Sequence, residues 1–261
     1  MSVEASLDLG ESPLIVNRRN VNRREFCLIA ASSAASLALG SACTPFAGSN
    51  DGRLIARPRE VVKTTVTGEI IIERDAILRL PQPTPQSSLP LLVMLHGATQ
   101  TGEDMFWYLG SAPQDTGVAV LAPKSRDTTW DAIGGSFGRD VEFLNQALER
   151  VFETVSIDPA RVAVGGFSDG ASYGISLGLI NGDLFRSVLA FSPGFVINGT
   201  PHSKPRIFIS HGTNDHILPI DRCGRRIASV LKARGYDVTF REFDGDHEIP
   251  ADIVREGLRF L

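Results

Sequence analysis

A Gly-x-Ser-x-Gly pentapeptide at 166–170, centred on Ser168, lies between a short apolar run and a helix-like segment. The apolar run Arg161–Gly165 has the composition of a buried strand. A serine on a tight strand-to-helix turn has a strained backbone, and small residues are needed beside it where a Cβ would collide with the strand or the helix. The pentapeptide therefore predicts a sharp strand–serine–helix turn that exposes the Ser168 hydroxyl.

The same pattern occurs a second time, at Gly134–Gly138 around Ser136. The residues before it, Asp127–Asp131, are too polar to form a buried parallel strand. Because the context differs, we expect Ser136 to lie in a loop and Ser168 to be the functional serine.

The length and composition of the chain favour one globular α/β domain. A chain of 261 residues with 43% hydrophobic residues can bury a sizeable core without division into two domains. The net charge of −4 provides no basic field, and no run of arginine and lysine is interleaved with aromatic residues. Nucleic acid is therefore excluded as an expected partner.

Residues 1–43 do not have the pattern of a folded domain. The pair Arg23-Arg24 precedes Phe26 and a mildly apolar stretch, Ile29–Leu39, which resembles a twin-arginine export signal. The alternative is an uncleaved signal anchor, but the stretch is short and serine-rich for a bilayer span of about 20 apolar residues. We expect a protein exported to the periplasm or another extracytoplasmic space.

Cys43 follows Ala42 at the end of this leader, as in a lipoprotein cleavage site. The alternative is ordinary cleavage near Ala42, so a lipid anchor at Cys43 is the one membrane attachment that the sequence suggests. After cleavage only Cys43 and Cys223 remain, which is no disulfide framework. We expect Cys223 to pack as a small apolar residue.

The rest of the chain divides into a linker and a catalytic domain. Residues 44–60 are rich in turn formers and predict a linker, and residues 61–261 predict the domain. The segments 61–67 and 69–80, separated by Gly68, alternate in polarity as an antiparallel strand pair does.

Beyond residue 90, short apolar runs alternate with longer amphipathic segments. This pattern is typical of a mostly parallel sheet that is buried on both faces. It predicts a three-layer α/β/α sandwich with antiparallel strands at the N-terminal edge and a site at the carboxyl ends of the strands. The expected strands are 91–95, 118–121, 161–165, 187–191, 206–210 and 238–243, and the expected helices are 139–154, 170–180, 221–234 and 251–260.

An acid and a histidine follow the serine in chain order, each after a predicted strand. Asp215 comes after the strand 206–210, and His247 comes after the strand 238–243. A serine hydroxyl needs a base within hydrogen-bond reach, and that base needs an acceptor that sets its tautomer. We therefore expect Ser168, His247 and Asp215 to act as nucleophile, base and acid.

Other histidines and acids compete for these two roles. Among the histidines, His247 alone lies between the final strand and the final helix; the competitors are His96, His202, His211 and His216. For the acid, Asp221 is expected to cap the helix that starts near Arg222, and Asp244 and Asp246 lie in the histidine loop itself.

An oxyanion hole requires two backbone amides directed at the developing negative charge. One is expected from Asp169, directly after the serine. The other is expected from Ala98, with Gly97 as the alternative, because the sequence 96–99 follows a predicted strand.

These motifs together resemble the phospholipase/carboxylesterase group of α/β-hydrolases, the small serine esterases, over about residues 60–261. The resemblance rests on the motifs 95–97, 166–170, 190–194, 211–219 and 246–247. It implies Ser168 as the nucleophile, Asp215 and His247 as its partners, and Ala98 and Asp169 as oxyanion donors. Well-known members carry Gln where this chain has Asp169, so the substrate class does not transfer with the motifs.

The sequence thus predicts hydrolysis of a small or medium carboxylic ester, with no metal or cofactor, because the histidines and cysteines lack ligand spacing. Trp130, Phe106 and Trp107, with Met105, are candidate walls of a substrate pocket, although such aromatics also cover cores. An oligopeptidase-like peptidase and a non-catalytic binding protein of the same fold are the alternatives.

Overall fold

The computed structural model describes residues 51–58 and 63–261, and its centre is one eight-stranded sheet. Six neighbouring strands run parallel, and β1 and β2 join one edge in antiparallel orientation, in the spatial order β1-β2-β4-β3-β5-β6-β7-β8. The strands are β1 (Glu69–Ile72), β2 (Ala76–Arg79), β3 (Leu89–Leu95), β4 (Ala119–Pro123), β5 (Ile157–Phe167), β6 (Ser187–Phe191), β7 (Arg206–Gly212) and β8 (Val238–Phe243).

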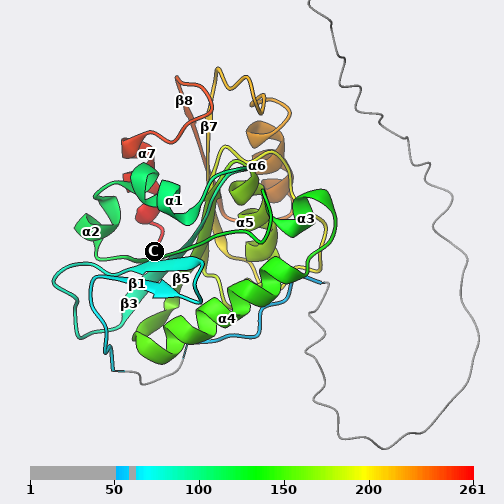
Figure 1. The fold of residues 1–261 in the computed structure, drawn as a ribbon. Coiled ribbons are helices and arrows are strands. Elements are labelled where there is room, and N and C mark those ends of the chain that lie inside the picture. Colours follow the sequence, from blue (N-terminus) through cyan, green and yellow to red (C-terminus); the bar gives the residue numbers. More distant parts are fainter. Residues whose placement is uncertain (1–50, 59–62) are drawn as a thin grey trace, which may run out of the picture. The chain divides into compact units, whose positions relative to one another are not determined.

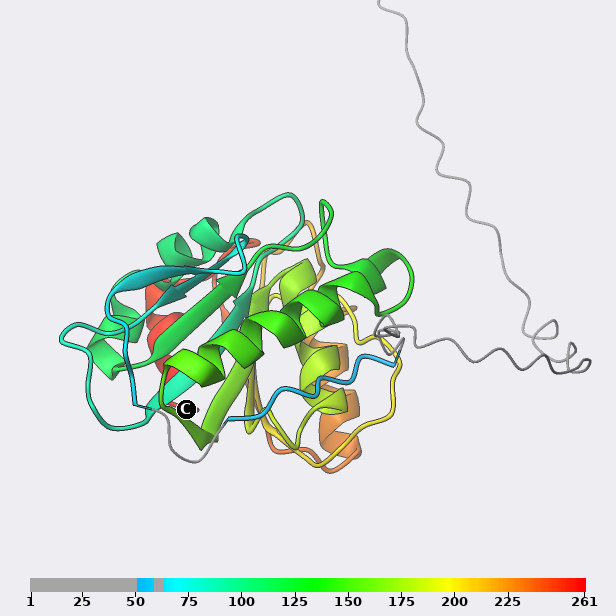
Figure 2. The same ribbon diagram turned by 60° about the horizontal axis from the view of Figure 1, so that its bottom comes forward.

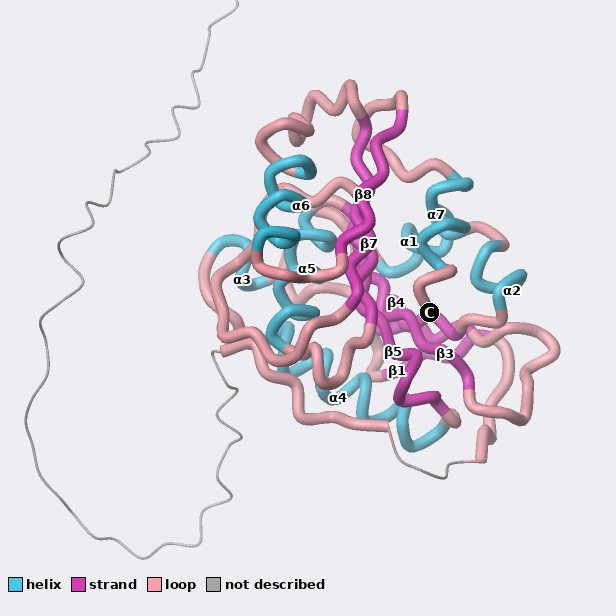
Figure 3. Tube along the Cα trace, turned by 180° about the vertical axis from the view of Figure 1, so that it is seen from behind, coloured by secondary structure: helices cyan, strands magenta, loops and turns pink. Residues whose placement is uncertain are grey.

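Helices cover both faces of this sheet, which confirms the expected three-layer sandwich (Figure 1). One face carries α3 (Asp131–Gly134), α4 (Arg139–Thr154), α5 (Asp169–Ile180) and α6 (Gly224–Ala233). The opposite face carries α1 (Gly102–Leu109), α2 (Ala112–Thr116) and α7 (Ala251–Leu258). Seen from behind, the strands form a single layer between the two groups of helices (Figure 3).

The apolar runs of the parallel strands supply the cores on both faces. In β3, Leu91 and Val93 join the core under α4 and α5, whereas Leu92 and Met94 join the core under α1 and α7. Successive side chains of a strand point to opposite faces, so a strand that is buried on both sides must be apolar at every position. This requirement explains why these strands could be predicted from apolar runs in the sequence.

All six predicted parallel strands are present, and β5 and β7 extend further than expected. The short helices α1, α2 and α3 were not predicted. The helix expected over 221–234 begins at Gly224, and the Asp221 carboxylate pairs with the Arg225 guanidinium at 2.7 Å instead of capping the helix. The predicted cap at Asp221 is therefore wrong, because the helix begins later than expected and Cys223 occupies its N-cap position.

The predicted antiparallel pair was placed one segment too early. The hairpin lies within 69–80, where β1 and β2 are joined by a turn at Glu73 and Arg74 with φ of 49° and 65°. Two successive positive φ values match the twist of a two-stranded hairpin. Gly68 is not the turn, and its carbonyl accepts the amide of Leu80. Glu-Arg lacks the usual Asn-Gly signal of such a turn, which explains the error.

Residues 51–58, within the range predicted as a linker, pack along the face of α4 and α5 (Figure 2). We call this segment the strap. The amide of Leu54 donates to Oδ1 of Asn181 at 2.8 Å, and Leu54 is 1% exposed. Asn145 of α4 accepts the next two backbone amides with its own Oδ1. Two asparagine side chains thus replace the strand partners that an extended segment requires.

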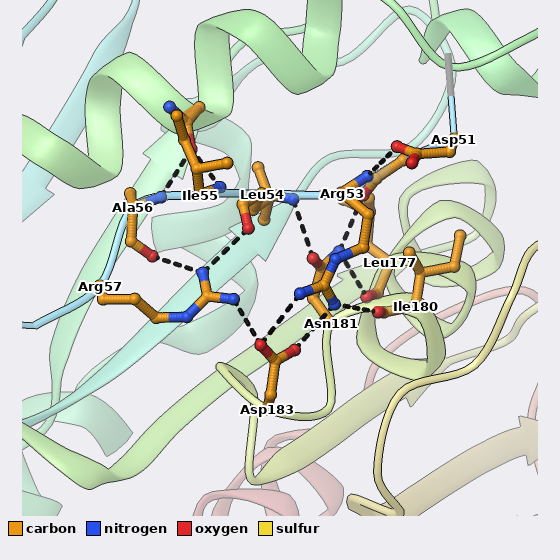
Figure 4. A network of polar contacts seen from close by, with 12 residues as sticks. Asp51, Arg53, Leu54, Ile55, Ala56, Arg57, Leu177, Ile180, Asn181 and Asp183 are labelled. Carbon is orange, nitrogen blue, oxygen red and sulfur yellow. Dashed lines mark hydrogen bonds and ion pairs between the residues drawn. The ribbon is translucent and has the colours of Figure 1, made fainter. Parts of the chain in front are cut away.

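Charged contacts hold the same strap at the end of α5 (Figure 4). Asp183 pairs with Arg53 at 2.8 Å and with Arg57 at 2.5 Å, and Arg53 also donates to the carbonyl of Ile180. The hydrogen bond from Arg53 holds the pKa of the Asp183 carboxyl below its usual range. Because the three side chains are partly exposed, water weakens these ion pairs, and they align the strap more than they stabilise the fold.

Within the residues that the structure describes, no helix is both long and apolar enough to cross a membrane. The leader 1–43 and Cys43 lie outside the described residues. Cys223 is buried, as expected of a cysteine that packs as a small apolar residue. It has no disulfide partner in the described part of the chain.

Candidate active site

Ser168 lies at the junction between β5 and α5 with φ of 56° and ψ of −117°, a strained conformation for a residue with a side chain. The flanking glycines make the turn possible. A Cβ on Gly170 would lie 2.2 Å from the carbonyl oxygen of Leu95, and one on Gly166 would lie 2.3 Å from the backbone of Gly170. This is the strand–serine–helix turn that the pentapeptide predicts.

The second pentapeptide forms no such turn. Ser136 is exposed in the loop between α3 and α4, and a Cβ on Gly134 would have nothing within 4 Å. The expectation that Ser136 lies in a loop is confirmed.

The loops after β7 and β8 bring Asp215 and His247 together. Nδ1 of His247 donates to Oδ2 of Asp215 at 2.7 Å, and the Asp215 carboxylate is buried. The two loops approach closely at Gly212, where a Cβ would lie 2.2 Å from the carbonyl oxygen of Asp246. The contact sets the imidazole tautomer, so that Nε2 of His247 is left as the basic nitrogen.

The Asp215 carboxylate has further donors. Its Oδ1 accepts the backbone amides of Ile217 and Leu218 at 2.9 and 2.7 Å, and its Oδ2 lies 3.2 Å from Nε2 of His211. This Nε2 also lies 2.6 Å from the carbonyl oxygen of Leu218, which can only accept, so Nε2 carries the hydrogen. Nε2 of His211 therefore donates to the Leu218 carbonyl, and the imidazole packs beside the Asp215 carboxylate; burial lowers the pKa of His211.

The ring of His247 packs against Phe167, the residue before Ser168, with the ring centroids 4.8 Å apart. Among the described residues, the Ser168 hydroxyl makes no hydrogen bond with His247. Hydrogen bonds of this kind commonly tighten only when substrate is bound. The structure thus brings the predicted base and acid into contact and places the base beside the turn that carries the serine.

The candidate oxyanion loop lies next to Ser168. A Cβ on Gly97 would lie 3.4 Å from Cβ of Ser168, and the Gly97 amide already donates to Oε1 of Gln100. The Ala98 residue is exposed. The amide of Asp169 belongs to the first turn of α5, where N–H groups have no partner within the helix. Since Gly97 is engaged, Ala98 is the better second donor, as the sequence analysis expects.

The Asp169 side chain also has a defined position. Its Oδ2 accepts the Thr129 hydroxyl at 2.7 Å, and Thr129 belongs to a loop that is joined to the oxyanion loop by the Thr99 amide and the Thr128 carbonyl. A carboxylate is therefore fixed beside the nucleophile position, where well-known members of the resembled group carry an amide.

The remaining histidines have other roles or partners. Nδ1 of the buried His96 donates to the carbonyl of Gly97, while Nε2 accepts the amide of Ser125 at 2.9 Å. Both ring nitrogens are used, so this imidazole joins two loops. His202 and His216 are exposed.

The competing acids bind elsewhere as well. Oδ1 of Asp246 accepts the backbone amides of His216 and His247, and Oδ1 of Asp244 accepts the Asn214 amide group at 2.9 Å. Neither carboxylate contacts the imidazole of His247, which leaves Asp215 as its acid.

Two of the predicted pocket aromatics are core residues. Trp130 is fully buried, stacks on Tyr173, and donates its Nε1–H to the carbonyl of His96 at 2.8 Å. Phe106 belongs to the core under α1 and is 6% exposed, and the Arg79 guanidinium lies over its ring. Met105 beside it is fully buried in the same core. Trp130 and Phe106 therefore pack as core residues, the alternative that the sequence analysis left open, because large rings gain most by complete burial.

Trp107 differs, because its side chain is 79% exposed on α1. It contacts Tyr108, whose ring lies 5.1 Å from Phe167, so a row of rings extends from Trp107 to His247. Trp107 remains a candidate for substrate contact. Tyr108, which the sequence analysis missed, comes before Trp107 in the row of rings that starts at His247. Only its contact with Phe167 in the folded chain identifies it.

The described residues contain no group of three or more His, Cys, Asp or Glu side chains placed to hold a metal ion.

Comparisons with known proteins agree with this geometry. The model of the phospholipase/carboxylesterase family matches residues 133–261, which include Ser168, Asp215 and His247 but not Ala98. Feruloyl esterase C from Emericella nidulans is 28% identical over 116 residues, which cover 44% of this chain and 42% of that protein. Acyl-protein thioesterase 1 from the same organism is 30% identical over 97 residues, which cover 33% of this chain and 40% of that protein. The chain thus spans about two fifths of these curated relatives.

Among solved structures, the carboxylesterase of Bacillus cereus has a TM-score of 0.56 and 20% sequence identity, over 71% of this chain and 92% of that one. At this identity the similarity concerns the fold, and it confirms the expected fold class.

The close backbone contact at Gly170 predicts a strong dependence of stability on this residue. Gly170→Ala forces a Cβ against the Leu95 carbonyl and should lower the free energy of unfolding by about 1–3 kcal/mol or more. Gly134→Ala, at a glycine of the second pentapeptide where a Cβ would meet nothing within 4 Å, should be nearly neutral. Urea unfolding of both variants measures the difference, and equal stabilities would contradict the steric account.

Proposed function

We propose that this chain is a carboxylesterase-like member of the α/β-hydrolase superfamily and that it hydrolyses carboxylic esters through an acyl-serine intermediate. The observation that carries the proposal is the 2.7 Å contact between His247 and the buried Asp215 beside the strained turn at Ser168. A buried carboxylate, an imidazole of fixed tautomer and a partly exposed serine are the parts that acyl transfer to serine requires.

In the first half of the reaction, Oγ of Ser168 attacks the ester carbonyl carbon while Nε2 of His247 takes the hydroxyl proton. The Asp215 carboxylate stabilises the resulting imidazolium, and the amides of Asp169 and Ala98 donate to the oxyanion. The carbon–oxygen bond to the alcohol then breaks, and His247 returns its proton to the leaving alkoxide. In the second half, water attacks the acyl-serine with the same proton transfers and releases the acid.

The buried surroundings of Asp215 support its role. Two backbone amides donate to the carboxylate in addition to His247, and the His211 imidazole packs beside it. These contacts hold the carboxylate in one orientation, so the His247 imidazole is oriented as well.

The substrate that fits this site is an ester with an uncharged acyl group. The relatives are named for feruloyl esters and for acyl-protein thioesters. In this chain the Asp169 carboxylate, held by Thr129, lies directly after the nucleophile and repels an anionic substrate. We therefore propose a small or medium neutral ester as the substrate, with Trp107 and Tyr108 as candidate contacts.

Ser168→Ala should abolish ester hydrolysis and labelling by a fluorophosphonate probe, because no other described serine lies on such a turn. Ser136→Ala is the matched control and should leave both nearly unchanged. Mass spectrometry of the labelled peptide identifies the serine. Labelling at Ser136 would contradict the assignment, and an unlabelled, folded protein without turnover on an ester panel would favour a non-catalytic binding role.

Asp215→Asn should lower kcat by about 10³- to 10⁴-fold, because an amide can orient the imidazole in the wrong tautomer and cannot stabilise its charge. Asp244→Asn in the neighbouring loop is the control and should change kcat little. Steady-state kinetics on one chromogenic ester compares the two variants. A mild effect at Asp215 would assign the acid role to another residue.

We also propose that residues 1–43 direct export by the twin-arginine route. The support is the pair Arg23-Arg24 followed by Phe26 and a mildly apolar stretch. Replacing both arginines by lysine should retain the protein in the cytoplasm, which cell fractionation detects. Unchanged export of the double variant would exclude this route.

A further inference from the structure

A cavity of about 350 Å³ lies between α5, α6 and the loop that follows β6. None of Ser168, Asp215 and His247 lines it. The end of α5 at Ile180 is twelve residues beyond Ser168, and at 1.5 Å per residue this is about 18 Å along the helix axis. The volume is at the lower end of the range for small-molecule pockets, so the cavity suits a small ligand.

The floor of the cavity is apolar, and its mouth exposes apolar side chains. Leu179 and Ile180 of α5 and Ile227 of α6 form the floor. Phe195 and Val230 line the same cavity, and each is 41% exposed. Exposed large hydrophobic residues that gather around a hollow favour a ligand that covers them.

The loop over the cavity is fixed to α5 by hydrogen bonds. The Gly194 amide donates to Oγ of Ser172, and the Ile197 amide donates to Oγ of Ser176, both at 2.9 Å. Two serine side chains on one helix therefore hold the loop in place. The cavity is preformed, which lowers the free-energy cost of binding.

Three arginines line the cavity on the α6 side. Arg222, Arg226 and Arg234 have no acidic partner within the described residues, although Arg225 on the same helix pairs with Asp221 and Glu242. Arg222 lies in the turn before α6, and Arg226 lies in the first turn of this helix. Two guanidinium groups on the wall of one cavity favour an anion there.

We propose that this cavity binds a carboxylic acid with an apolar body, with the carboxylate between Arg222 and Arg226 and the body on Ile180 and Ile227. Planar guanidinium groups match the two oxygens of a carboxylate. The apolar floor accounts for the rest of the molecule. The concave shape favours a single soluble molecule over a flat membrane surface. The site is separate from the proposed catalytic residues.

Calorimetric titration of the full chain with sodium octanoate tests the proposal. Octanoate should bind, whereas 1-octanol, which lacks the charge, and inorganic phosphate, which lacks the apolar chain, should bind much more weakly. The double variant Arg222→Gln with Arg226→Gln should weaken octanoate binding by about tenfold or more, since hydrogen bonds to charged groups are lost. Lys232→Gln, which removes one positive charge from α6 away from the cavity, should leave binding unchanged.

A second variant, which adds a negative charge to α6, tests the same site and is expected to leave this helix intact. Val230→Glu places a carboxylate four residues from both Arg226 and Arg234, where it pairs with these arginines and adds a negative charge to the wall of the cavity. This variant should remain folded and lose octanoate binding. Octanoate binding that persists in both the Val230→Glu and the double arginine variants would overturn the proposal.

Ser168→Ala separates this site from the proposed esterase site, and it should bind octanoate as the unchanged chain does. Loss of binding in Ser168→Ala alone would place the ligand at the catalytic serine and overturn the proposal. Binding to phosphatidylglycerol vesicles that requires the two arginines, without binding of octanoate, would assign the arginines to a membrane surface and also overturn it.

Discussion

The contact between the first turn of α5 and the end of β3 sets the geometry of the whole site. Gly170 lies so close to the carbonyl of Leu95 that no other side chain fits, and Gly166 has the same restriction against α5 itself. Because the helix starts this close to the sheet, the chain must turn sharply at Ser168, which takes a positive φ. The same turn leaves the Asp169 amide at the helix N-terminus beside the serine. Backbone strain here is balanced by the packing of α5 on both neighbouring strands.

The buried carboxylate of Asp215 connects the remaining parts of the site. It accepts from two amides of its own loop and from His247 after the neighbouring strand, and it lies 3.2 Å from Nε2 of His211 in β7. Parallel strands bring their carboxyl ends to one edge, so residues 32 positions apart in the chain meet there. The carboxylate thus both joins the two loops and orients the proposed base.

The parallel strands could be predicted because each must be apolar on both faces, and the long helices because each is amphipathic over several turns. The short helices α1, α2 and α3 have too few turns for a clear period, and they were missed. The β1–β2 hairpin was misplaced because Glu73 and Arg74 form a turn that usually contains Asn and Gly. The prediction of the serine turn, with Gly166 and Gly170 beside it, was correct because its steric demands are local.

What the sequence determined by itself is therefore the fold class, the serine turn and the order of the residues proposed for the triad, because local patterns of size and polarity govern these features. The tertiary structure decided the environments. Trp130 and Phe106 are core residues, and Tyr108 lies beside Phe167. Three unpaired arginines of the described chain line a cavity between α5 and α6. Burial and partners depend on which distant segments pack together, and no local pattern contains that information.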